Sequence, residues 1–427
     1  MLLRITDGTT TLTLSGSGVY LGATYFPISQ ANADRVGESV PVILEGTDSA
    51  IRAAVQDIQQ LLRAAANRNK TLTARYFVEF RPVDTATDIY RAELFGGDAN
   101  YSQVPAERSL YNATSTVRVN VTWERAARWE GPEEELYLSS SSQSERTGGV
   151  SLSINDNAGT PNWVGIASAR VKGTQPAPIR LRITNSSGSG LAWRNFYIGN
   201  NAYSTPGSAD VWLLGSEATG GATASWAAGT GHSALQWLIP LNATLLGQAQ
   251  GRTFRVIGAF TSISATAAVR ASVGPYVGGV FDFGRIGPER QNVGGVIDLG
   301  EFPIPPGGYN VANAAAALAI TVRSPSASGG GTLDFVMLMP TDSYRRLRQN
   351  AYTIPNTDSI EDDGIEGGTY WLSGSSRYPT LRSSGAPLMV FPERDQRIYI
   401  MADENGAWTA GRAITVRAWY RPVYDNV

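Results

Sequence analysis

The chain of 427 residues contains no cysteine and a single histidine, His232. The absence of cysteine excludes disulfide bonds, thiol catalysis and cysteine-based zinc sites. With one histidine, a metal site built from several histidines of one chain is excluded as well. The sequence therefore lacks the side chains of the commonest metal centres and thiol-based active sites.

Charge is also scarce. Charged residues make up 17% of the chain, compared with about 25% in an average soluble protein. The formal net charge is −2, and the only lysines are Lys70 and Lys172. No overall field would draw this chain to nucleic acid or to anionic lipid. Low charge together with 46 glycines is typical of β-rich proteins whose surfaces are covered by neighbouring chains.

Catalytic and targeting motifs are absent from the sequence. It has no P-loop, no dinucleotide-binding glycine fingerprint, no HExxH and no G-x-S-x-G. The first residues, MLLRITDGTT, have no apolar core of a signal peptide, and no run of 18 apolar residues follows. We expect a protein that is not an enzyme, needs no cofactor, reads no nucleic-acid sequence and inserts into no membrane.

Residues 1–131 have a pattern of their own, which predicts a β-domain with one helix. Residues 2–5 and 12–14 flank the turn Asp7-Gly8 and predict a β-hairpin. Residues 40–44 (VPVIL) predict a buried strand, and alternation over residues 117–123 predicts another. Strands on both sides of a single helix indicate a β-sandwich or split barrel with the helix packed on it.

The helix is predicted over residues 49–67. Residues 47–49 are all of types that cap helix N-termini. Apolar side chains recur at a period near 3.6 residues and predict one buried face, made of Ile51, Val55, Ile58, Leu61 and Leu62.

The rest of the chain divides into three stretches. Residues 132–149 are polar and rich in serine, which predicts a linker or long loop. Residues 150–350 contain many short alternating strands and predict a jelly-roll β-sandwich. Residues 351–427 are predicted to hold an acidic loop and C-terminal strands, which complete either the N-terminal domain or the jelly roll. The predicted fold class is mainly all-β.

One candidate ion site is the segment IEDDGIEGG, residues 360–368, which we expect to be a loop. Its region brings together five carboxylates, those of Asp358, Glu361, Asp362, Asp363 and Glu366. Loops rich in oxygen ligands bind calcium, but this spacing does not match an EF-hand. A solvated run of charges is the alternative, and no metal is assigned.

Tryptophans in loop-like contexts are candidates for glycan binding, because aromatic rings stack on sugars. The candidates are Trp163, Trp193, Trp226, Trp371 and Trp408. Core or interface anchors are the alternative role for these side chains. A hydrolase based on His232 would need a distant serine and aspartate, whereas a glycosidase would need only two carboxylates.

The order of elements resembles the tail-tube and distal-tail proteins of long-tailed bacteriophages. The resemblance lies in VPVILEG, then IRAAVQDIQQLLRAA, then VRVNVTWERAARWEG in the first 131 residues, and in TLDFVMLMPTDSYRRL and RAITVRAWYRP later. It covers most of the chain loosely and carries no catalytic residues. It implies a tail-tube-like N-terminal domain followed by a jelly-roll domain.

That resemblance implies a structural virion protein, assembled in the host cytoplasm and incorporated in the phage tail. Its partners would be further copies of itself in a ring at the tail tip or baseplate, other tail proteins and a host surface glycan. Two alternatives stay open: a glycan-binding adhesin or tail-fibre protein, and a polysaccharide hydrolase.

Overall fold

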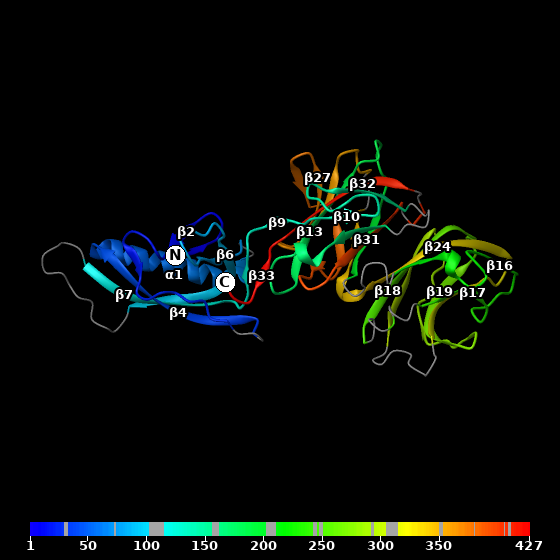
Figure 1. Cartoon of the computed structure of the whole chain (residues 1–427), viewed down its shortest axis with the longest axis horizontal. Helices are drawn as coiled ribbons and strands as arrows, with labels where there is room; N and C mark the ends of the chain where they lie inside the picture. The colour runs from blue at the N-terminus through cyan, green and yellow to red at the C-terminus, as the bar shows by residue number, and fades with distance from the viewer. Residues whose placement is uncertain are drawn as a thin grey trace. The chain divides into compact units, whose positions relative to one another are not determined.

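A computed structural model describes most of the chain: residues 1–29, 33–71, 74–101, 115–155, 162–201, 211–241, 246, 251–291, 294–304, 315–349, 353–379, 381–404, 406–408 and 411–427. The chain forms two compact units. Unit 1 comprises Met1–Glu134, Lys172–Gln175 and Arg421–Val427, and unit 2 comprises Glu135–Val171 and Pro176–Tyr420. Both chain termini lie in unit 1 (Figure 1).

Unit 1 is built on one strongly curved sheet of nine strands, which closes almost into a barrel. Its main path runs in the order β2-β1-β5-β6-β7-β4-β3, and β8 and β33 extend it beside β6. The strands are β1 (Leu2–Thr6), β2 (Thr11–Thr13), β3 (Val19–Leu21), β4 (Arg35–Gly46), β5 (Phe77–Arg81), β6 (Tyr90–Tyr101), β7 (Ser115–Ala126), β8 (Trp129–Glu130) and β33 (Val423–Tyr424). The predicted hairpin is confirmed as the antiparallel pair β1 and β2.

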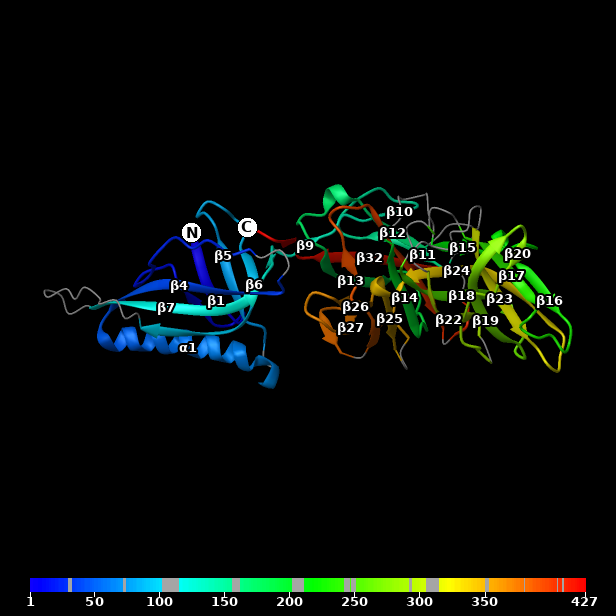
Figure 2. The ribbon, with the colours of Figure 1, turned by 90° about the horizontal axis from the view of Figure 1, so that it is seen from below.

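The helix α1 (Asp48–Thr71) runs along one side of this sheet (Figure 2). It extends a little beyond the predicted range at both ends. All five residues of its predicted apolar face are buried in the core of unit 1. At its start, the hydroxyl of Thr47 accepts a hydrogen bond from the backbone N–H of Ala50. The predicted domain with one flanking helix is therefore confirmed.

Unit 2 contains only antiparallel strand pairs in its described part. A six-stranded sheet has the order β10-β12-β31-β14-β25-β29 and an eight-stranded sheet the order β11-β32-β13-β26-β27-β28, with β9 beside β32 and β30 beside β13. These strands are β9 (Glu134–Glu135), β10 (Ser139–Ser140), β11 (Val150–Ile154), β12 (Trp163–Ile166), β13 (Ala177–Asn185), β14 (Asn195–Asn201), β25 (Tyr344–Arg348), β26 (Ser359–Asp363), β27 (Thr369–Ser373), β28 (Ser376–Tyr378), β29 (Arg382–Gly385), β30 (Met389–Val390), β31 (Gln396–Asp403) and β32 (Arg412–Tyr420).

Residues 212–340 add two five-stranded sheets between β14 and β25, and the two sheets share one apolar core. Their strands are β15 (Trp212–Leu214), β16 (Thr223–Trp226), β17 (Leu235–Pro240), β18 (Thr253–Ile263), β19 (Ala268–Val277), β20 (Val280–Phe281), β21 (Arg285–Ile286), β22 (Val296–Pro303), β23 (Ala315–Arg323) and β24 (Gly329–Pro340). The described part of unit 2 also contains the short 3-10 helices η1 (Ser168–Arg170), η2 (Gly215–Glu217) and η3 (Thr341–Ser343).

Two predicted boundaries are wrong. The stretch 132–149 is not simply a linker, because it contributes β9 to the eight-stranded sheet and β10 to the six-stranded one. Residues 150–350 do not form a domain of their own, because β11, β13 and β14 pair with strands that follow residue 350. The C-terminal stretch serves both units: β31 and β32 lie in unit 2, whereas Arg421–Val427 returns to unit 1.

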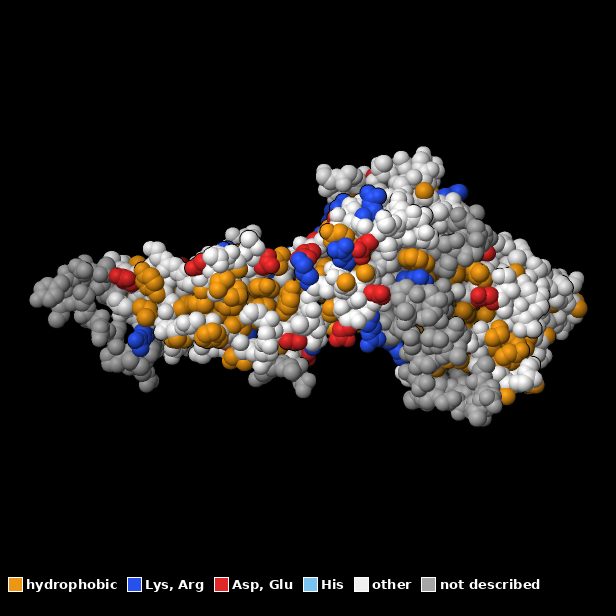
Figure 3. Space-filling model, in the orientation of Figure 1, with side chains coloured by type: hydrophobic (Ala, Val, Ile, Leu, Met, Phe, Trp, Pro, Cys, Tyr) orange, Lys and Arg blue, Asp and Glu red, His pale blue; other side chains and the backbone are white. Residues whose placement is uncertain are grey.

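Apolar side chains also reach the surface. Large exposed apolar residues of unit 1 are Tyr20, Phe26, Ile28, Val83 and Tyr101. Figure 3 shows hydrophobic side chains gathered on the viewed face of unit 1. Within the described part of the chain, no helix has both the length and the apolar character needed to cross a bilayer.

Candidate functional site

The most distinctive feature of unit 1 is an unpaired stretch along the edge of β4. On one side, β4 pairs with β7 over its whole length, from Arg35 to Gly46. On the other side, β3 pairs only with residues 42–44. Two further bonds join the Gly22 N–H to the Pro41 carbonyl at 2.7 Å and the Glu45 N–H to the Gly18 carbonyl at 2.9 Å. Among the described residues, no strand pairs with this side of residues 35–40.

The direction of the unpaired backbone groups follows from strand alternation. In an antiparallel ladder, successive residues direct their N–H and C=O groups to opposite sides of the strand. The Pro41 carbonyl accepts from Gly22 and the Glu45 N–H donates to Gly18, so these residues face away from β7. Gly37 and Ser39 share their parity and therefore direct their backbone groups outward. Both are exposed, which leaves an open template for another strand.

Behind this edge lies a buried ion pair between Glu38 and Arg125, with side chains 2% and 0% exposed. The two Glu38 carboxylate oxygens accept from Arg125 Nη2 at 2.5 Å and from Nε at 2.9 Å. The Tyr25 hydroxyl and the Trp123 indole N–H also donate to this carboxylate, at 2.6 and 2.8 Å. The Arg125 guanidinium lies 4.4 Å from the centre of the Trp129 ring. Every partner needed by a buried charge pair is thus present.

The electrostatics of this pair keep it charged. Burial alone would raise the pKa of Glu38, but the hydrogen bonds and charge of Arg125 outweigh it and hold that pKa below its usual value. Burial and the neighbouring Glu38 charge raise the pKa of Tyr25. Tyr25 therefore stays protonated as a donor, and Glu38 stays ionised as an acceptor.

The same ion pair fixes the neighbouring segment of residues 25–28. The Ile28 N–H donates to Glu38 Oε1 at 2.8 Å, and Arg125 Nη2 donates to the Ile28 carbonyl at 3.0 Å. Phe26 lies between Tyr25 and Ile28, which are both bound in this way; Phe26 is 78% exposed, and Ile28 is 45% exposed. A segment with an anchored backbone loses less freedom on binding, which suits its exposed apolar residues to protein contacts.

Hollows lie on both sides of the β4 edge. One, of about 260 Å³, is mostly apolar and is lined by Tyr25, Phe26, Ile28, Val40 and Pro41, among others. The other, of about 630 Å³, is open, and its lining includes Gly37, Ser39, Asp98, Thr122 and Glu124. Backbone pairing with hollows for alternate side chains is the arrangement that proteins use to bind an added strand.

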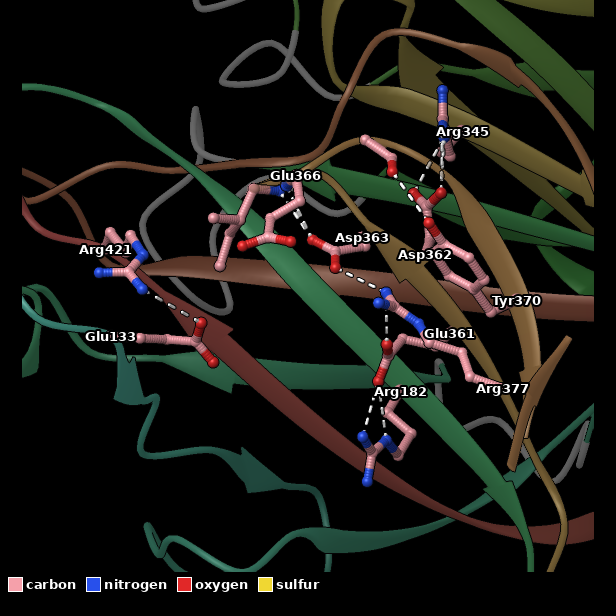
Figure 4. A network of polar contacts seen from close by, with 12 residues as sticks. Glu133, Arg182, Arg345, Glu361, Asp362, Asp363, Glu366, Tyr370, Arg377 and Arg421 are labelled. Atoms are coloured by element: carbon pink, nitrogen blue, oxygen red, sulfur yellow. Dashed lines mark hydrogen bonds and ion pairs between the residues drawn. The ribbon is translucent and has the colours of Figure 1, made fainter. Parts of the chain in front are cut away.

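The prediction of an acidic loop over residues 360–368 is wrong for its first part. Asp358 directly precedes β26, and Glu361, Asp362 and Asp363 lie within this strand, so residues 359–363 are not a loop. Their carboxylates are buried and bound by arginines: Glu361 by Arg182 and Arg377, Asp362 by Arg345, and Asp363 by Arg377 (Figure 4). Glu366 follows in the turn, where its N–H donates to Asp363.

The carboxylates of Glu361, Asp362 and Asp363 do not fit a calcium site, because they already accept hydrogen bonds from guanidinium groups. In the described residues, no group of three or more acidic or histidine side chains is suited to hold a metal ion. The Arg377 guanidinium also stacks 3.5 Å from the centre of the Tyr370 ring. The cluster therefore joins strands β13, β26, β27 and β28.

None of the five candidate tryptophans is fully exposed. Trp163, Trp226 and Trp371 lie in strands, so their predicted placement in loops is wrong. Trp193 is buried against Phe196 and Trp226 against Trp237, so neither offers the open ring face that stacking on a sugar requires. The other three are partly exposed: Trp408 packs against Phe335, Trp163 lies beneath the Arg397 guanidinium, and Trp371 packs against Tyr378.

His232 lies between a hydroxyl and a carboxylate. Its Nδ1 is 3.0 Å from Thr321 Oγ1, and its Nε2 is 2.8 Å from Glu289 Oε2. This order of groups is that of a nucleophile, a base and an orienting acid. However, Thr321 is 1% exposed within β23, so no substrate reaches its hydroxyl. Burial lowers the pKa of His232, and this histidine links the buried Thr321 to the exposed Glu289 in a structural contact.

Neither the free β4 edge nor the segment that holds Phe26 could be predicted from the sequence as a site. One signal was present: in V-G-E-S-V-P-V, residues 36–42, Glu38 occupies the parity of the buried valines. A lone carboxylate on an apolar strand face needs a buried partner, and Arg125 has the matching parity in β7.

A scan against protein-family models and searches of curated proteins and solved structures find no match to this chain.

Proposed function

We propose that this chain is a structural protein of a long-tailed phage tail, which works by assembly rather than by catalysis. In this proposal, unit 1 forms an oligomeric ring at the tail tip or baseplate, and unit 2 contacts other tail proteins or the host surface. Its place would be the virion, after assembly in the host cytoplasm. The order of elements in unit 1, one curved sheet with one amphipathic helix, is compatible with the resemblance to tail proteins.

The observation that carries the proposal is the unpaired edge of β4 beside the exposed Phe26 and Ile28. An open strand edge next to a fixed apolar segment is a liability for a protein that remains a monomer. It is useful for a protein that adds a strand from a neighbour, because pairing satisfies the backbone groups and covers the apolar side chains.

The test is the mass of the purified full chain, measured by light scattering over a range of concentrations, with negative-stain microscopy of the same samples. Rings or short tubes of one copy number support the proposal. A monomer at every concentration, including after mixing with lysate from phage-infected cells, contradicts it.

Two of the candidate tryptophans, Trp193 and Trp226, are buried and do not favour the alternative of a glycan-binding protein. The buried Thr321 of the Thr321–His232–Glu289 group does not favour a hydrolase. A glycan array is still the measurement that separates these alternatives from assembly. Binding that disappears after substitution of a single aromatic residue, without any higher-order assembly, would replace the proposal. Turnover of a polysaccharide that depends on one carboxylate would do the same in favour of a hydrolase.

A further inference from the structure

Two neighbouring arginines at the edge of the six-stranded sheet of unit 2 have no acidic partner. Among the described strands, β29 pairs with β25 alone, and in this pair Arg348 lies directly opposite Arg382. Both residues are exposed. Within the described part of the chain, neither side chain bonds to a carboxylate, whereas the nearby Arg345 binds Asp362. Like charges directly opposite each other in a sheet repel, so an anion bound between them would relieve this repulsion.

Two further hydrogen-bond donors lie on the same face of these two strands. Arg346 lies opposite Ser384, and these residues are two positions along from Arg348 and Arg382 in their strands. Residues two apart in a strand share a face and lie about 7 Å apart, and the Cβ atoms of directly opposite residues are about 5 Å apart. Side chains as long as arginine can therefore reach one common point above this face. The four residues offer three guanidinium groups and a hydroxyl to a single ligand.

The guanidinium of Arg346 is already fixed in position. Its Nε and Nη2 atoms donate to Asn195 Oδ1 at 3.1 and 2.7 Å, and its centre lies 5.3 Å from the centre of the Tyr197 ring. Asn195 is held in turn, because its amide nitrogen donates to both carboxylate oxygens of the buried Asp403, at 2.8 and 3.0 Å. The Nη1 atom of Arg346 takes no part in these bonds. A donor that is ordered before binding loses little further freedom when a ligand arrives.

We propose that the face of β25 and β29 formed by Arg346, Arg348, Arg382 and Ser384 binds a phosphate group, either as the free anion or as a monoester. Guanidinium groups match phosphate oxygens with paired N–H donors and cannot lose their charge at any ordinary pH. The two arginines without an acidic partner carry a charge of +2, which balances a phosphate dianion of about −2. A carboxylate would neutralise only one of them. The site lies in unit 2 and does not depend on strand addition at the β4 edge.

The test is a titration of the purified full chain with inorganic phosphate at pH 8 and constant ionic strength, followed by phosphorus NMR. We expect saturable binding, and Arg382→Gln should raise the Kd by about tenfold or more, because it removes charge-assisted hydrogen bonds. Arg382→Lys keeps the charge but loses the paired donors, so its Kd should lie between these two. Arg412→Gln is the matched control, since it removes an exposed arginine from β32 of the other sheet and changes the net charge equally. Its Kd should equal that of the wild type.

Glucose 6-phosphate is the second probe and identifies the source of the phosphate. A Kd equal to or lower than that of inorganic phosphate assigns the site to a phosphate monoester, whereas binding of inorganic phosphate alone assigns it to the free anion. Arg348→Gln repeats the test from the opposite strand, and thermal melting checks that each variant is folded. A wild type that binds neither probe overturns the inference. So does binding that Arg382→Gln and Arg412→Gln weaken equally, or that neither Arg348→Gln nor Arg382→Gln weakens; the two arginines would then only keep the edge strand from pairing with other chains.

Discussion

Asp362 and Arg345 form a bidentate ion pair inside unit 2. Arg345 Nε lies 2.9 Å from Asp362 Oδ2, and Nη2 lies 2.9 Å from Oδ1. The side chains are 2% and 13% exposed. Asp362 belongs to β26 of the eight-stranded sheet and Arg345 to β25 of the six-stranded sheet. The pair therefore joins the two sheets, and burial raises the pKa of Asp362 although Arg345 opposes this.

Removing one partner of this pair should be costly. Arg345→Met leaves a buried carboxylate without its cation, and we expect a loss of about 3 kcal/mol in the free energy of unfolding at pH 7. The double variant Arg345→Met/Asp362→Leu should lose less than the single one, because it buries no unpaired charge. Urea unfolding of the full chain measures both. As a control, Lys172→Met breaks the more exposed pair with Glu134 and should change stability by less than about 1 kcal/mol. Equal losses in the single and double variants would show that the pair is not coupled.

Glu135 predicts that the stability of the fold depends on pH, because its pKa is lowered. Hydrogen bonds from Arg417, at 2.8 and 2.9 Å, lower the pKa of Glu135 below its ordinary value of 4.5. A carboxyl with a lowered pKa in the folded state stabilises the fold above its unfolded pKa. That contribution is lost as the pH falls through the folded pKa.

The variant Glu135→Gln isolates this contribution, because glutamine resembles the protonated carboxyl. We expect the wild type to be more stable than the variant at pH 6, and the difference to shrink steadily as the pH falls below 4.5. Urea unfolding at a series of pH values measures the difference. A difference that stays constant down to pH 3 would show that Arg417 does not act through the charge of Glu135.

Features that depend on local periodicity could be predicted, and features that depend on remote partners could not. The face of α1 that includes Val55 and Ile58 repeats every 3.6 residues, so it is visible in the sequence. The carboxylates of β26 looked like a solvated loop, because they form a charge run beside glycines. Their partner Arg345 lies 17 residues away, and Arg182 lies 179 residues away. No local sequence pattern predicts contacts between residues so far apart in the chain.

The candidate site was hidden for a related reason. The residues VPVIL predict a strand, but they do not predict whether its edge is paired, because that depends on the whole sheet. The segment of residues 25–28 carries no local signal either, since its backbone is anchored at Ile28 by Glu38 and Arg125, which are 87 residues apart. The predicted linker over residues 132–149 failed because its polar strands join strands far along the chain.

Charge on the buried face of α1 should abolish folding of unit 1. Val55 and Ile58 are both buried against the sheet, and an aspartate at either position has no cation to pair with. We expect Val55→Asp and Ile58→Asp to remove the cooperative melting of unit 1. Gln56→Asp, on the exposed face, is the control and should melt within a few degrees of the wild type. Melting of either core variant like the wild type would contradict the helix packing.

Tyr424 tests whether the last residues of the chain are part of unit 1. In β33, Tyr424 pairs with Trp129 of β8, and its ring meets that of Tyr90 edge to face, with ring centres 5.6 Å apart. We expect Tyr424→Ala to destabilise unit 1 by about 1–2 kcal/mol, through lost aromatic contact and lost burial. Tyr424→Phe keeps the ring and should cost less than half of that. Chemical denaturation followed by the fluorescence of Trp129 and Trp123, which both lie in the core of unit 1, measures the effect. If the alanine variant is as stable as the wild type, residues 421–427 are dispensable. Unit 1 would then fold without the C-terminal strand β33.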